Sequence, residues 1–84
     1  MTSVVVLVLG ADERLLADAL ERVGEAGGVI VLDSSSEGLE ALERALPDPR
    51  VWYQIGDAGV VPLPDDSVDA ALGDSTPDVE RVVR

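Results

Sequence analysis

The sequence predicts one α/β domain, a three-layer sandwich whose middle layer is a short parallel sheet. Two apolar patterns alternate along its 84 residues. Continuous apolar runs are typical of strands that are buried on both faces of a parallel sheet. Between these runs, apolar residues recur three and four positions apart, which indicates helices with one buried side. These patterns predict the order strand, helix, strand, helix, strand, loop, strand, helix. Strands separated by helices pair in parallel, which gives the three-layer sandwich.

The first strand and the first helix are predicted at the start of the chain. Residues 4–9 form an apolar run that ends at Gly10. From Asp12 onwards, the apolar residues return at helical spacing, at Leu16, Ala19, Leu20 and Val23. An acidic residue suits the positive end of a helix dipole, so Asp12 marks the start of the helix, and Gly24 or the pair at 27–28 ends it.

A second strand and a second helix follow. Residues 29–32 are the second apolar run, which is closed by Asp33. The serines at 34–36 offer side-chain oxygens that cap a helix, and Pro47 stops it. The apolar side of this helix consists of Leu39, Leu42 and Leu46.

The last part of the chain predicts two more strands and a short helix. The third strand covers residues 51–55 and ends at the Gly-Asp pair at 56–57. A loop that contains prolines leads to a weaker, alanine-rich fourth strand at about residues 68–72. The Thr-Pro pair at 76–77 suits the N-cap and first turn of a last helix.

The composition excludes several kinds of chemistry. Seventeen acidic residues face six basic ones, all arginine, which gives a net charge of −11. The sequence contains no His, Cys or Lys, so a Cys/His zinc site, a thiol nucleophile, a histidine base and a Schiff-base lysine are excluded. Direct nucleic-acid binding is not expected, because it depends on basic groups that neutralise phosphates. The longest apolar run is too short to span a bilayer and no basic residue precedes it, so we expect no membrane contact and a cytoplasmic location.

Three of the predicted strands end in residues that suit a ligand. In open parallel sheets, ligands bind beyond the carboxyl ends of the strands. The first strand ends in Gly10, the second in Asp33 and the third in Gly56 and Asp57. A glycine lets the backbone approach a ligand closely. An acid after the second strand can accept both hydroxyls of a ribose, and a second acid can accept from an exocyclic amine, which together describe an adenosine pocket.

The strand ends and the loop that follows them resemble the class I S-adenosylmethionine-dependent methyltransferases. Residues 56–58 read Gly-Asp-Ala, and residues 62–72 read Pro-Leu-Pro-Asp-Asp-Ser-Val-Asp-Ala-Ala-Leu. This stretch is similar to the Gly-Asp-Ala, the Leu-Pro-rich turn and the Asp-x-Ser-Phe-Asp that precede the fourth strand in small-molecule enzymes of that family. Residues 76–81 are similar to the start of the helix that follows. With Asp33 closing the second strand, the resemblance covers nearly the whole chain.

The resemblance implies a truncated Rossmann-like methyltransferase fold with strand order 3-2-1-4, formed by residues 1–84 as one domain. It also implies S-adenosylmethionine as cofactor. Asp33 is then expected to hold the ribose hydroxyls, Asp57 and the backbone of Ala58 to meet the adenine, and Gly10 to lie under the methionyl part. No catalytic residue and no metal ligand is implied.

The first loop departs from the family pattern. The family has an acid followed by three alternating glycines, and only Gly10 is retained here. Val8 replaces the acid, while Asp12 and Arg14 replace the second and third glycines. Asp12 is expected to repel the carboxylate of S-adenosylmethionine, and Arg14 is the cation that could compensate.

The second departure is length, because the family's fifth to seventh strands have no counterpart. The fourth strand, which is central in the family, then becomes an edge with unpaired backbone groups. We therefore expect a homodimer or a complex with a partner protein, formed through the fourth strand and the last helix. The chain alone is not expected to be catalytic.

A simpler interpretation exists for each candidate residue. Asp33 can serve as a helix-capping or turn residue, Asp57 as part of a Gly-Asp turn, and Gly10 as a tight turn between strand and helix. The acids at residues 65–69 suit a solvated turn better than a cation site. Two functions thus remain open: a methyltransferase-like domain that binds S-adenosylmethionine, or a cofactor-free interaction or regulatory module that acts as a homodimer or partner subunit.

Overall fold

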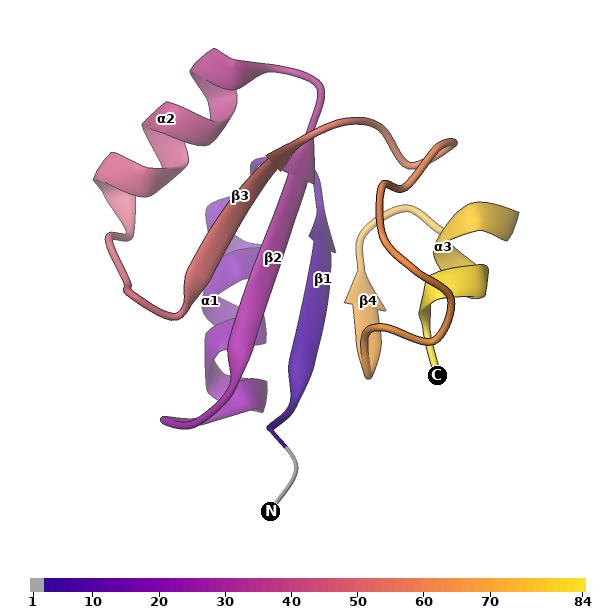
Figure 1. Ribbon diagram of the computed structural model, residues 1–84. Coiled ribbons are helices and arrows are strands. Elements are labelled where there is room, and N and C mark those ends of the chain that lie inside the picture. The colour runs from indigo at the N-terminus through magenta and orange to yellow at the C-terminus, as the bar shows by residue number, and fades with distance from the viewer. Residues whose placement is uncertain (1–2) are drawn as a thin grey trace.

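A four-stranded parallel sheet forms the middle layer of the fold (Figure 1). The computed structural model describes residues 3–84, so the first two residues of the expected domain lie outside the described part. The strands are β1 (Val5–Leu9), β2 (Gly28–Asp33), β3 (Val51–Ile55) and β4 (Ala70–Leu72). They lie in the order β3-β2-β1-β4, and every pairing is parallel. The predicted strand order 3-2-1-4 and the α/β class are confirmed, and the fold is a small Rossmann-like sandwich.

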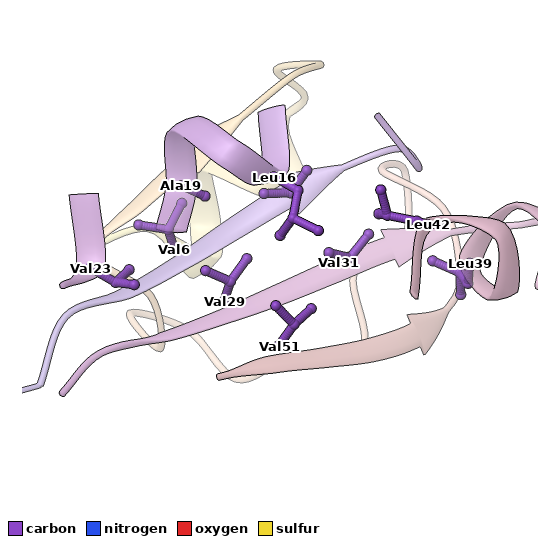
Figure 2. Close-up of a cluster of buried hydrophobic side chains, with 10 residues drawn as sticks. Val6, Leu16, Ala19, Val23, Val29, Val31, Leu39, Leu42 and Val51 are labelled. Atoms are coloured by element: carbon purple, nitrogen blue, oxygen red, sulfur yellow. The ribbon is translucent and has the colours of Figure 1, made fainter. Parts of the chain in front are cut away.

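Helices α1 (Glu13–Val23) and α2 (Ser36–Ala45) cover one face of the sheet, and α1 lies behind the strands in Figure 1. Side chains alternate between the two faces of a strand, so every second residue of β1, β2 and β3 points toward these helices. Figure 2 shows the buried cluster that results, which consists of Val6, Val8, Leu16, Ala19, Val23, Val29, Val31, Leu39, Leu42 and Val51. None of the helices within residues 3–84 is both long enough and apolar enough to cross a membrane.

Helix α3 (Pro77–Val82) and the loop between β3 and β4 pack on the other face. The buried residues on this side are Leu7, Leu9, Leu32, Val61, Val68, Val79 and Val82. These elements do not cover the outer edge of the sheet, where Trp52 of β3 is 59% exposed. Its neighbour Tyr53 points to the opposite face and packs against the first cluster.

The ends of the elements follow the local signals in the sequence, with one difference. Gly24 ends α1 with a positive φ of 68°, a conformation that favours glycine. The fourth strand is shorter than predicted and begins at Ala70, because Val68 forms an isolated parallel bridge with Val83 instead. Each helix begins after a residue whose side chain accepts main-chain hydrogen bonds, namely Asp12, Ser35 and Thr76.

Candidate functional site

A hollow of about 170 Å³ lies at the carboxyl ends of β1, β2 and β3. The structure brings together here all four residues that the resemblance singled out, although they come from three separate segments of the chain. The residues that line the hollow are Leu9, Gly10, Leu32, Asp33, Ser34, Gly56, Asp57, Ala58 and Asp74. Parallel pairing explains this convergence, because the loops that follow parallel strands gather at one edge of a sheet.

Gly10 occupies the turn that leads from β1 into α1. Its φ of +103° lies in the region that side chains rarely adopt, and a Cβ built on it would meet no atom within 4 Å. Its amide donates to the carbonyl oxygen of Leu32, with the nitrogen and oxygen 2.8 Å apart. The backbone conformation therefore requires a glycine whether or not a ligand lies above it.

The carboxylate of Asp33 joins two loops. Its Oδ2 accepts a hydrogen bond from the amide of Ala11 at 2.9 Å, and its Oδ1 accepts one from the amide of Ser35 at 3.1 Å. The first bond fixes the β1–α1 loop and the second shapes the turn before α2. Each carboxylate oxygen has a second lone pair, so Asp33 keeps the capacity to accept from ligand hydroxyls.

Asp57 folds the loop after β3 back on itself. Its Oδ1 accepts from the amides of Gly59 and Val60, at 2.7 and 3.2 Å. The other oxygen, Oδ2, accepts no hydrogen bond within the described residues, and the side chain is exposed at the wall of the hollow. Asp57 therefore forms the predicted Gly-Asp turn through Oδ1 and keeps Oδ2 as a free acceptor.

Helix α3 holds the wall on which Ala58 lies. The hydroxyl of Thr76 donates to the carbonyl oxygen of Ala58 at 2.5 Å, and the carboxylate of Asp78 accepts from the amide of Val61. Arg81 donates to the carbonyl oxygens of Val61 and Leu63, both at 2.9 Å. The hydrogen bond from Arg81 also holds the pKa of Asp78 below its usual range, because it stabilises the charged carboxylate.

Two acceptors at the hollow were missed by the sequence analysis. Asp74 and Ser34 line it beside the predicted residues. Asp74 follows β4, and Ser34 follows β2. The carboxyl ends of all parallel strands lie at one edge, so the position of Asp74 after the fourth strand was the signal that could have found it.

The donors of the β1–α1 loop are already engaged. The amide of Ala11 donates to Asp33, and the amide of Asp12 donates to the carbonyl oxygen of Gly10. At the start of α1, the amides of Arg14 and Leu15 both donate to Asp12 Oδ1, at 2.8 and 3.2 Å. The positive end of the helix is therefore capped by a carboxylate of the chain itself.

These groups fit one part of S-adenosylmethionine and not another. Asp33, Ser34 and Asp57 offer acceptors to ribose hydroxyls and an adenine amine. The amino-acid carboxylate needs donors or a cation, and among the described residues that line the hollow there is no arginine. Arg14, the expected compensating cation, is exposed and lies outside that lining.

The acidic turn before β4 makes contacts of its own. Asp65 pairs with Arg81 at 2.5 Å, and Asp69 Oδ2 accepts from the amide of Val5 at 2.8 Å. Over the described range 3–84, no group of three or more acidic side chains is placed to hold a metal ion. The structure thus uses these acids in ion pairs and hydrogen bonds.

No protein-family model and no curated protein matches the sequence. Inference about the function therefore depends on the fold, on the residues at the strand ends and on their geometry.

Proposed function

We propose that the chain is a methyltransferase-like domain that binds the adenosine part of an S-adenosylmethionine-type nucleoside. One observation carries this proposal: Gly10, Asp33, Asp57 and Ala58 line a single hollow at the carboxyl edge of the sheet. Ligands of open parallel sheets bind at that edge. The four residues come from three separate loops, with Asp57 and Ala58 adjacent in one of them, so no local turn required these loops to meet in one place.

Each residue has a role in the proposed complex. Asp33 accepts from the ribose hydroxyls, Asp57 Oδ2 accepts from the adenine amine, and Gly10 leaves the backbone open beneath the 5′ side of the ribose. The proposal covers binding and excludes methyl transfer by this chain alone, because a hollow of about 170 Å³ is smaller than sites of roughly 300–1,000 Å³ that enclose whole ligands.

Titration calorimetry with S-adenosylhomocysteine and 5′-methylthioadenosine tests the proposal. Asp57→Asn keeps the oxygen that accepts from Gly59 and Val60 but replaces Oδ2 with a donor, so it should weaken binding at least fivefold through the loss of about 1 kcal/mol. Asp66→Asn makes the same change of charge outside the hollow, at a residue in the loop before β4, and should leave affinity unchanged. Absence of heat with both nucleosides at millimolar concentration, from folded protein, would falsify the proposal.

A second function, self-association, is favoured by the open edge of β4. Within the described sheet, β4 pairs with β1 alone. The amide of Asp69 donates to Val5, so alternation turns the amides of Ala70 and Leu72 toward the unpaired side. A groove of about 470 Å³ borders this edge and is lined by Ala70, Ala71, Val79 and Val83 together with polar neighbours. We propose that a second copy pairs here, which makes the chain an interaction module.

Light scattering over a range of salt concentrations tests this second proposal. Each chain carries a net charge of −11, so two copies repel one another and association should strengthen as salt screens the charge. Ala70→Pro removes an amide at the open edge of β4 and should reduce the dimer. A monomer at all salt concentrations and at hundreds of micromolar protein would contradict self-association.

A further inference from the structure

The hollow at the strand ends carries an unbalanced charge. Asp33, Asp57 and Asp74 all line it, and none of the described residues that line it is basic. Asp33 is fixed by main-chain amides of two loops and Asp57 by amides of its own loop, whereas Asp74 is exposed and accepts no hydrogen bond within the described residues. A ligand in this hollow therefore meets three carboxylates.

The neighbouring β1–α1 loop has no free main-chain donor that could attract an anion into the hollow. In a Rossmann-like fold, the natural place for a negative group is the N-terminus of the first helix, where free amides and the dipole attract it. Here Asp12 occupies that place, and its carboxylate accepts the amides of Arg14 and Leu15. An incoming carboxylate or phosphate would have to displace Asp12 or lie against it.

We propose that the hollow selects nucleosides whose 5′ substituent carries no negative charge. Neutral thioether nucleosides and nucleosides with a cationic 5′ group then bind in preference to those with a carboxylate or phosphate. This inference rests on the proposed nucleoside site and narrows its ligand class. The hollow is then not expected to favour intact S-adenosylmethionine, because the amino-acid carboxylate of that molecule finds no cation among the described residues that line it.

A charge series on one nucleoside tests the selection. Adenosine is the neutral member, 5′-amino-5′-deoxyadenosine is the cation, and adenosine 5′-monophosphate is the anion. Calorimetry at low salt should rank the cation first, the neutral compound second and the anion last, with about a tenfold step between neighbours. Raising the salt concentration should compress the series, since the hollow is open to solvent.

Two matched variants locate the source of the selection. Asp74→Asn removes one charge at the hollow, and no hydrogen bond of Asp74 is present among the described residues to be lost. It should reduce the ratio of cation to anion affinity about threefold or more. Asp66→Asn removes one charge elsewhere on the surface. It should change the logarithm of the cation-to-anion affinity ratio by less than half of the change that Asp74→Asn causes.

The outcomes separate the two proposals. If no member of the series binds to the folded protein, the nucleoside site itself is wrong and the selection falls with it. If the anion or S-adenosylhomocysteine binds as tightly as adenosine, the site stands and the selection is wrong. If Asp74→Asn and Asp66→Asn change the ratio equally, net charge of the chain causes the ranking, and selection by the hollow is refuted.

Discussion

Asp33 provides a quantitative test of how the site is built. Its carboxylate accepts from the amide of Ala11, which is partly buried, and from the amide of Ser35, which is exposed. Asp33→Ala removes both acceptors. The amide of Ser35 regains water, so most of the cost comes from Ala11. A hydrogen bond to a charged group contributes about 1.5–3 kcal/mol, and we expect the free energy of unfolding to fall by that amount.

Urea unfolding followed by circular dichroism measures this loss. For a small domain the slope is about 1 kcal/mol per molar urea, so the midpoint should fall by about 1.5–3 M. Asp57→Ala is the control, because Oδ1 of Asp57 serves only exposed amides and its loss should cost about 0.5 kcal/mol or less. Equal midpoints for wild type and Asp33→Ala would refute the structural role of Asp33, and so would equal losses in the two variants.

Three further predictions concern the rest of the fold. Hydrogen bonds from Arg50 lower the pKa of Asp48 to about 2 in the folded chain, so the stability that Asp48 contributes is full above about pH 4 and is lost toward pH 2. The melting temperatures of wild type and Asp48→Asn should therefore differ at pH 7 and converge near pH 2. A difference that stays constant with pH would contradict the lowered pKa of Asp48. Arg81→Lys cannot reproduce the several hydrogen bonds of the guanidinium and should lower the melting temperature, unlike Arg22→Lys at an exposed ion pair. Equal melting temperatures for these two variants would contradict the role of Arg81 in holding the loop between β3 and β4. The buried hydroxyl of Tyr53 has no hydrogen-bond partner among residues 3–84, so Tyr53→Phe should keep or raise stability in urea. A loss of stability above about 1 kcal/mol would show that the hydroxyl is hydrogen-bonded.

The sequence predicted the fold well because its signals are local and consistent. The apolar runs at residues 4–9 and 51–55 match β1 and β3 to within one residue. Asp12 caps the start of α1 and Gly24 ends it, as the local sequence signals predict. The start of β4 could not be predicted, because the departure of Val68 from the sheet depends on its pairing with Val83, a contact between distant segments.

The candidate site was predictable in position and less so in detail. Parallel topology places Gly10, Asp33 and Asp57 at one edge, so their convergence follows from the strand order. Which polar groups of the loops form hydrogen bonds with one another depends on how the loops are placed to within tenths of an ångström. The bond from Ala11 to Asp33 is such a contact, and no pattern in the sequence announces it. Asp74 was missed because it lies beyond the weakest predicted strand.

The nucleoside site can be tested most directly by nuclear magnetic resonance of ¹⁵N-labelled protein titrated with 5′-methylthioadenosine. The account predicts that the amides of Gly10, Asp33, Ala58 and Asp74 shift together along one saturating curve. The amide of Trp52, on the open outer part of the sheet, should stay unchanged. Saturable shifts centred on Trp52, or no shifts at millimolar ligand, would contradict the assignment of the hollow as a nucleoside site.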